Sequence, residues 1–248
     1  MDLGLQDHVF VVSGGSRGLG RAAALALIAE GARVVLMGRD PGVLRATVEE
    51  LGDAARGVHA DLADPLSAEL ACAHAREEFG RLDGAIISGG GPAPGSAMTL
   101  TDDQWRLAFE HVFLGGLRLA RAVLSQPAPT SVAWVLSTSA EETLPGLSAS
   151  NGLRPGLAML IKDLSDEVAP RGSRINGLLP GRIATDRIAA LDAAAGPEAA
   201  ARTLASIPMG RYGQPEEFGR VAAFLVSPAA SYVTGSLVRI DGGLIRQP

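Results

Sequence analysis

Residues 9–20 read VFVVSGGSRGLG, an apolar run that passes directly into a glycine-rich turn. A short run of β-branched and aromatic residues beside glycines predicts a strand buried on both faces of a parallel sheet. The alanine-rich residues 21–30 predict a helix after the turn, which ends at Gly31. This order of strand, glycine turn and helix predicts an anion site, because the first turn of a helix offers free N–H groups.

Three glycines of this turn have separate mechanical roles. Gly14 permits the tight turn, Gly18 lets the backbone approach a pyrophosphate, and Gly20 lets the helix pack against the sheet. The turn has a strand before it and a helix after it, as the mechanism requires. The sequence therefore predicts a dinucleotide-binding turn, and the alternative interpretation is an incidental loop.

Strand and helix patterns alternate along the rest of the chain. This alternation predicts the α/β fold class, with a doubly wound parallel sheet, helices on both faces, and a single domain over residues 1–248. The longest insertion, residues 181–214, is expected to form a lid over the carboxyl ends of the strands, where such sheets bind ligands. The expected strands are residues 33–37, 57–60, 85–87, 132–136, 175–179 and 237–240, and the expected helices are residues 41–51, 65–80 after an Asp64 cap, 101–124 with a Thr101 cap, 155–168 and one from Pro215.

The composition excludes several classes of protein. The 248 residues are 47% apolar and carry a net charge of −5, which argues against disorder and against nucleic acid as a partner. No apolar stretch reaches the roughly 18 residues of a membrane span, and the start of the chain lacks a signal-peptide pattern. The single Cys72 excludes an internal disulfide, and with the four histidines it shows no metal-site spacing. We expect a cytoplasmic protein with no metal and no membrane partner.

Two arginines indicate which dinucleotide the turn binds. Arg39 follows the second predicted strand, and Arg17 lies inside the glycine turn. At this position a carboxylate would bind the ribose 2′-hydroxyl of NAD, whereas arginine accepts the 2′-phosphate of NADP. The sequence therefore favours NADP(H) over NAD(H). In the alternative interpretation, Arg39 is a solvated surface charge and Asp40 caps the next helix.

Nearly the whole chain resembles the short-chain dehydrogenase/reductase family, of the 3-oxoacyl-(acyl-carrier-protein) reductase type. Residues 13–20 resemble its Thr-Gly-x-x-x-Gly-x-Gly opening, and residues 232–235 and 240–243 resemble its closing segments. The resemblance implies a Rossmann sheet of about seven strands, a small carbonyl or alcohol substrate, and a homodimer or homotetramer paired through the helices at 102–124 and 152–168. The cofactor-binding residues predicted from the turn, the arginine and the resemblance are Gly14, Ser16, Arg17, Gly18, Leu19, Gly20, Arg39, Asp61, Leu62, Ser88, Gly89, Gly90, Pro180, Gly181, Ile183 and Thr185.

The residues that transfer protons in this family are largely replaced. The family uses Asn, Ser, Tyr and Lys, and here Val112 stands at the asparagine position. Counting without a gap places Ser150 at the tyrosine position and Arg154 at the lysine position. A rival alignment places Leu147 and Asn151 there, so both alignments lose the Tyr-x-x-x-Lys pair.

The family serine remains, as Ser137 or Ser139 at the end of a predicted strand. A serine hydroxyl does not titrate near neutral pH, and an arginine stays protonated, so neither replaces the lost pair directly. Pro155 disfavours helical conformation at Arg154. We therefore expect this helix to begin near Pro155 or to be distorted there, so that Ser150 and Arg154 do not share one face.

Three functions are compatible with these residues. The leading hypothesis is an NADP(H)-dependent oxidoreductase with an altered proton relay, in which Ser137 or Ser139 orients the substrate oxygen. In it Ser150 or water supplies the proton and Arg154 holds the nicotinamide ribose. The alternative is a catalytically silent NADP(H)-binding sensor or scaffold. A third hypothesis is a non-redox lyase or isomerase with His111 or Glu141 as its base.

Overall fold

A seven-stranded parallel sheet forms the centre of the molecule in this computed structural model, which describes residues 2–246. The strand order is β3-β2-β1-β4-β5-β6-β7, so the chain winds outward from β1, returns to β4 and winds the other way. This order confirms the predicted Rossmann-type sheet, and it places a reversal between β1 and β4 where such sheets bind ligands. The strands are β1 Val9–Ser13, β2 Arg33–Gly38, β3 Ala55–His59, β4 Gly84–Ile87, β5 Ser131–Val135, β6 Arg174–Pro180 and β7 Leu237–Ile240.

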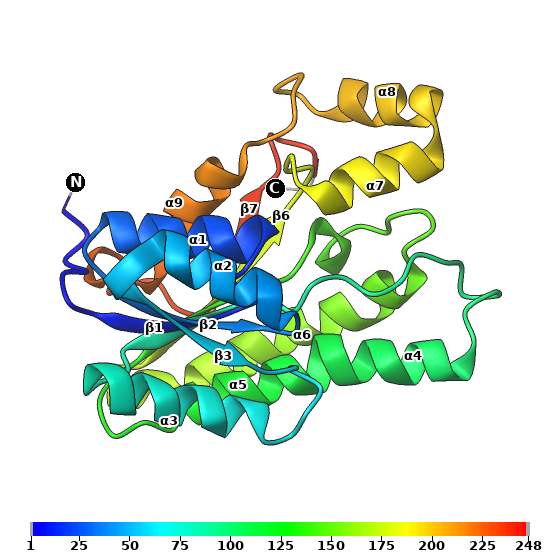
Figure 1. Cartoon of the computed structure of the whole chain (residues 1–248). Coiled ribbons are helices and arrows are strands. Elements are labelled where there is room, and N and C mark those ends of the chain that lie inside the picture. Colours follow the sequence, from blue (N-terminus) through cyan, green and yellow to red (C-terminus); the bar gives the residue numbers. More distant parts are fainter. Residues whose placement is uncertain (1, 247–248) are drawn as a thin grey trace.

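Helices cover both faces of the sheet (Figure 1). Strand β1 shows why its sequence is continuously apolar: Val9 and Val11 pack on one face, while Phe10 and Val12 pack on the other. None of the helices within residues 2–246 has the length and apolar character needed to cross a bilayer. The helices on one face are α1 Gly18–Ala29, α2 Pro41–Leu51 and α9 Pro215–Val226, and those on the other are α3 Ser67–Phe79, α5 Gly115–Leu124 and α6 Ser148–Val168.

Most helix boundaries follow the expected caps. Helix α2 has its predicted bounds, and Asp40 Oδ1 accepts hydrogen bonds from the backbone N–H groups of Gly42 and Val43. The predicted start of α3 is wrong, because the helix begins at Ser67 and not at Pro65. Asp64 instead accepts a hydrogen bond from Leu66 N at 2.9 Å, which closes a separate turn before the helix.

The predicted helix at 101–124 is one continuous rod with an irregular centre. It comprises α4 Asp102–Ala108, a π-helical stretch Phe109–Leu114, and α5. Thr101 caps it as predicted: Gln104 N donates to Thr101 Oγ1 at 3.3 Å, and Thr101 N donates to Gln104 Oε1 at 2.8 Å. These two bonds satisfy backbone donors that the first turn leaves free.

Removing this cap is expected to cost a small amount of stability. Thr101→Ala should lower the free energy of unfolding by about 1 kcal/mol, which lowers Tm by about 2–4 °C for a chain of this size. Thermal unfolding followed by circular dichroism measures the shift. The control Gln104→Glu keeps an acceptor for Thr101 N–H and should leave Tm within about 1 °C. An unchanged Tm in Thr101→Ala would show that the cap does not contribute.

Helix α6 begins at Ser148 and runs through Pro155, so the expectation that it begins near Pro155 is wrong. Asn151 anchors its first turn to the preceding loop, since Leu144 N donates to Asn151 Oδ1 and Asn151 Nδ2 donates to Leu144 O, both at 2.9 Å. A proline inside a helix removes the hydrogen bond to the carbonyl four residues earlier, and its ring crowds that carbonyl. The buried side chains on both sides of Pro155, including Arg154 and Leu157, hold the helix together across that gap.

Residues 181–214 carry two helices that stand away from the sheet, α7 Asp186–Ala195 and α8 Pro197–Ser206 (Figure 1). Asp192 of α7 ties this segment together at its base. It accepts hydrogen bonds from Tyr212 Oη at 2.8 Å and from Arg182 Nη1 at 3.0 Å. Tyr212 therefore has a structural partner in the described structure, as its turn-like sequence context suggests.

Candidate active site

The glycine turn has the geometry of an anion cradle. Gly14 has φ +60°, and a Cβ there would lie 2.3 Å from the Ser88 carbonyl oxygen. A Cβ at Gly20 would lie 2.3 Å from the Gly14 carbonyl oxygen. Gly18 has φ +56° and faces open space, with no atom within 4 Å of its ideal Cβ position. Arg17 precedes α1 without capping it, so no side chain in the described residues occupies the free N–H groups at this end.

The glycine turn and the loop after β4 are joined at the reversal of the sheet. Ser88 N donates a hydrogen bond to Ser13 Oγ at 2.9 Å. Gly89 lies close to the segment after β3, since a Cβ at Gly89 would be 3.4 Å from Leu62 Cδ1. Ser16 is buried under α2, where Thr47 Oγ1 donates to its carbonyl at 3.3 Å. The structure thus brings the predicted glycine turn, Leu62 and the 88–90 loop together.

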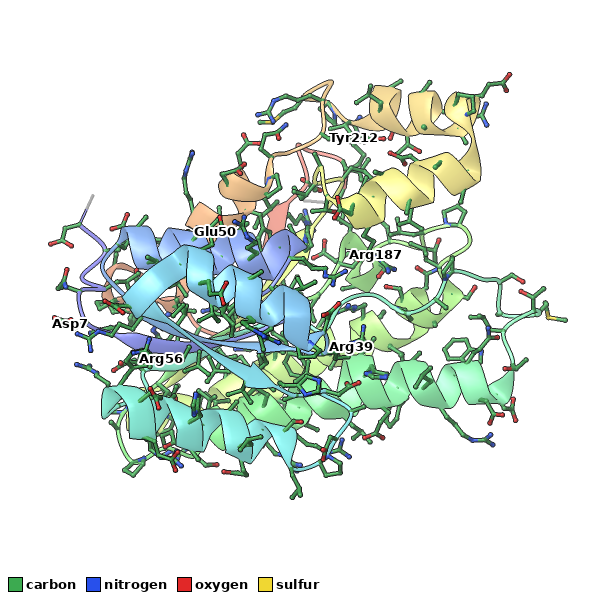
Figure 2. The ribbon with its side chains drawn as sticks, in the orientation of Figure 1. Asp7, Arg39, Glu50, Arg56, Arg187 and Tyr212 are labelled. Carbon is green, nitrogen blue, oxygen red and sulfur yellow. The ribbon has the colours of Figure 1, made fainter. Side chains whose placement is uncertain are left out.

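A hollow of about 420 Å³ lies at the ends of β2 and β3, and its lining includes Arg39, His59 and Asp61. Arg39 lies at the end of β2 near this hollow (Figure 2). The predicted phosphate-binding arginines are only loosely held: Arg39 Nη1 lies 4.0 Å from Asp61 Oδ2, and Arg17 Nη2 lies 3.9 Å from Asp40 Oδ2. Such exposed, long contacts hold a side chain weakly, so both arginines are free to turn toward a ligand.

A second hollow of similar size, about 440 Å³, lies between α8 and residues 210–214. None of the predicted site residues lines it. We therefore place the candidate site at the strand ends and not in this hollow, because the glycine turn and the buried polar groups gather there.

The residues predicted for the nicotinamide end lie together after β6. Gly181 N donates to Ile240 O at 3.0 Å, and a Cβ at Gly181 would lie 2.8 Å from Asp241 Cα. Pro180 ends β6, and Ile183 forms an isolated parallel bridge with Gly213. Thr185 then caps α7, accepting a hydrogen bond from Ile188 N at 3.5 Å. This segment leads directly from the sheet into α7.

Two serine hydroxyls meet beneath the loop that follows β5. Ser139 Oγ and Ser150 Oγ lie 2.8 Å apart, and both residues are buried. Ser137 Oγ instead accepts a hydrogen bond from Ser139 N at 3.1 Å and so caps the short 3₁₀ turn Thr138–Ala140. The structure therefore separates the two candidate serines: Ser137 shapes the turn, and Ser139 faces Ser150.

Ser150 and Arg154 lie on one buried face of α6, contrary to the expectation from Pro155. Arg154 is 5% exposed and donates from Nη1 to Val135 O at 2.8 Å and from Nη2 to Gly90 O at 3.0 Å. Burial, together with the charge of Arg187, lowers the pKa of Arg154 to about 10. Its Nε is buried without a hydrogen-bond partner among the described residues. Arg154, one turn after Ser150, thus links α6 to the loop after β4.

The other candidate acid–base groups have partners outside the serine pair. Val112, at the expected asparagine position, is buried in the core, and His111 Nδ1 lies 3.1 Å from Asp61 Oδ1. Glu141 accepts a hydrogen bond from Arg239 Nε at 2.6 Å. The rival alignment also finds no site, because Asn151 is bonded to the backbone of Leu144. Among the candidates for the proton relay, the buried polar groups at the strand ends are therefore the serine pair and Arg154.

A family model described as "Enoyl-(Acyl carrier protein) reductase" matches residues 14–245. The chain belongs to the short-chain dehydrogenase/reductase family. This short-chain dehydrogenase/reductase is 31% identical over 245 residues to the 3-oxoacyl-(acyl-carrier-protein) reductase FabG of Salmonella typhimurium, covering 98% of this chain and 99% of that relative. It is 34% identical over 251 residues to an uncharacterized oxidoreductase of Mycobacterium tuberculosis, covering 97% and 93%.

Solved structures agree with this assignment. The L-sorbose reductase of Gluconobacter frateurii, crystallised with NADPH and L-sorbose, superposes with a TM-score of 0.91 at 27% identity and covers 100% of both chains. A short-chain dehydrogenase of Bacillus anthracis gives a TM-score of 0.89 at 27% identity, covering 98% of this chain and 100% of that one. The oxidoreductase family and its fold are thereby established for the chain.

Sequence reasoning missed one residue of this short-chain dehydrogenase/reductase site. Arg187, in the first turn of α7, donates from Nη1 to Gly91 O at 3.3 Å and from Nη2 to Pro92 O at 3.0 Å. Figure 2 shows it beneath α7, on the side facing the sheet. Its place two residues after Thr185 was the available signal, because the first turn of a lid helix starts at the strand ends.

Proposed function

We propose that the protein is an NADP(H)-dependent oxidoreductase that acts on a carbonyl or alcohol substrate through an altered proton relay. The observation that carries this proposal is the 2.8 Å contact between Ser139 Oγ and Ser150 Oγ. Arg154, one turn after Ser150, reaches the loop beside the glycine turn. We infer that a substrate oxygen meets the cofactor beside this pair, because ligands of such sheets bind at the strand ends.

When bound, NADP(H) supplies the hydride. Ser139 Oγ donates a hydrogen bond to the substrate oxygen and polarises it. A serine hydroxyl does not give up a proton near neutral pH unless it receives another one. In the relay, Ser139 gives its proton to the substrate oxygen as Ser150 gives its own proton to Ser139, and water restores the proton of Ser150. An uncommitted N–H of Arg154 would donate to a hydroxyl of the nicotinamide ribose.

The arrangement around this site completes the proposal. We propose one domain in which residues 181–214 act as a lid, since α7 follows β6 and its Arg187 bonds the loop after β4. We also propose a homodimer or homotetramer, since Leu107, Phe109 and Met159 leave apolar side chains exposed on the helices at 102–124 and on α6. Burial raises the pKa of the Cys72 thiol to about 12, so this cysteine is unreactive, which suits the cytoplasmic location that we propose.

Nucleotide binding followed by turnover tests the proposal. NADPH and NADH are titrated into the purified protein by nucleotide fluorescence, and NADPH oxidation is then followed against a panel of ketones and quinones. Binding with turnover supports the oxidoreductase. Binding without turnover on the whole panel contradicts it and supports the silent sensor or scaffold. No binding of either nucleotide contradicts both.

The preference for NADP(H) depends on Arg39. Arg39→Ala should raise the Kd of NADPH about 10-fold, because a charge-assisted contact to the 2′-phosphate contributes about 1.5 kcal/mol. The Kd of NADH should change less than about twofold, since NADH has no phosphate there. Fluorescence titration of both nucleotides measures the effect, and the exposed Arg45→Ala on α2 is the matched control. An equal loss of NADH affinity would contradict the assignment of Arg39 to the phosphate.

A further inference from the structure

Two arginines from different elements hold the same loop after β4. Arg154 of α6 donates to Gly90 O at 3.0 Å, and Arg187 of α7 donates to Gly91 O at 3.3 Å and Pro92 O at 3.0 Å. The two guanidinium groups bond consecutive carbonyls, so the charge of Arg187 lies close enough to help lower the pKa of Arg154. The loop is therefore flanked by two guanidinium groups close enough to repel each other.

Neither guanidinium has a negative partner. Among residues 2–246, no carboxylate forms an ion pair with Arg154 or Arg187. Arg182 shows the contrast in the same segment, since its Nη1 lies 3.0 Å from Asp192 Oδ1. Hydrogen bonds to carbonyl oxygens satisfy N–H donors but leave the positive charge uncompensated. Burial lowers the pKa of Arg154, whereas Arg187 is an exposed residue whose guanidinium an incoming ligand can reach.

The position of Arg187 is built into the loop. A Cβ at Gly91 would lie 2.3 Å from Nη2 and 2.5 Å from Cζ of Arg187, so the guanidinium crosses a backbone position that only glycine leaves open. Arg154 is 5% exposed, and its Nε has no partner among the described residues. Two positive charges close together without a negative partner are costly, and a bound anion offsets their repulsion.

We propose that the substrate carries a carboxylate, which binds to Arg187 and is further stabilised by the charge of Arg154. The proposal rests on the oxidoreductase function and names its substrate class, an oxo acid or the corresponding hydroxy acid. A planar guanidinium binds a carboxylate through two parallel hydrogen bonds, which fixes the orientation of the ligand. The ribose hydroxyl assigned to Arg154 is neutral, so it leaves the charge of the arginine pair for the substrate.

Matched acids and esters test this proposal in protein saturated with NADP⁺. Isothermal titration calorimetry measures the binding of 2-, 3-, 4- and 5-oxo acids and of their methyl esters, with no turnover because the nucleotide and the ligands are both oxidised. In at least one pair we expect the acid to bind about 30-fold more tightly than the ester, as for a charge-assisted bidentate contact. Arg187→Gln should remove that difference and leave ester binding unchanged.

Two substitutions of Arg187 separate the effect of its charge from its effect on the structure. Arg187→Gln removes the charge and keeps a polar side chain, whereas Arg187→Lys keeps the charge and should retain acid binding within about fivefold. The exposed Arg202 of α8 provides the matched control, Arg202→Gln, with unchanged binding. A role that is only structural predicts no advantage of Lys over Gln at this position.

Three results would overturn the proposal. The first is equal binding of acids and esters, and the second is no binding of any acid. The third is a loss of NADPH affinity in Arg187→Gln equal to its loss of acid affinity, which would assign the arginines to the nucleotide. If NADP⁺ itself does not bind, the same titrations on the nucleotide-free protein still decide whether acids are preferred. A preference there would keep the anion site and refute the oxidoreductase.

Discussion

Replacing Ser150 by alanine is expected to lower kcat about 100- to 10,000-fold, the range that a proton-transferring group contributes. The substitution removes the hydroxyl that lies 2.8 Å from Ser139 Oγ. Ser139 then has no group in the relay from which to regain a proton, so the substrate oxygen must take one from disordered water. The Kd of NADPH should stay within about twofold, because the hydrogen bond of the Ser150 side chain goes to Ser139 and not to a residue assigned to the nucleotide phosphates.

Steady-state kinetics with the best ketone of the panel, together with fluorescence titration of NADPH, measure this split between kcat and Kd. Ser148→Ala, two residues earlier on α6, is the matched control and should keep kcat within about twofold. Ser150→Thr keeps a hydroxyl and should lose less than about 10-fold. An unchanged kcat in Ser150→Ala would show that the proton reaches the substrate by another route.

The central fold was predictable because its signals are local. Strand β1 is buried on both faces, so its sequence is apolar throughout, and the glycines after it occupy positions that a Cβ would obstruct. The caps Thr101 and Asp40 form bonds to backbone groups within three residues. Each of these features is decided by side chains and backbone close together in the sequence.

The features that the sequence failed to predict have a different physical origin. Pro155 disfavours a helix locally, but the buried contacts of α6 outweigh the one hydrogen bond that it removes. The π-helical stretch Phe109–Leu114 follows an ordinary helical pattern, so nothing local predicts its wider turn. Arg187 was missed because its partners, Gly91 and Pro92, are more than 90 residues away in the chain. Tertiary contacts decide all three features.

A substitution at Gly18 tests most directly whether the glycine turn binds the nucleotide. Gly18→Ala should raise the Kd of NADPH about 100-fold, since a methyl group in the open space above the turn displaces a phosphate from its charge-assisted hydrogen bonds. The left-handed backbone at φ +56° adds a cost of about 1–2 kcal/mol in stability. Fluorescence titration measures the Kd, and urea unfolding measures the free energy of unfolding.

Gly80 provides the matched control for this test. It ends α3 at φ +76°, it has nothing within 4 Å of its ideal Cβ position, and it is remote in sequence from the glycine turn. Gly80→Ala should therefore lose about the same 1–2 kcal/mol of stability while leaving the Kd of NADPH within about twofold. If Gly80→Ala weakened NADPH binding as much as Gly18→Ala, general loosening of the fold would account for both. If Gly18→Ala left the Kd unchanged, the pyrophosphate would not lie over this turn, and the serine pair would have to be reassessed without a hydride donor beside it.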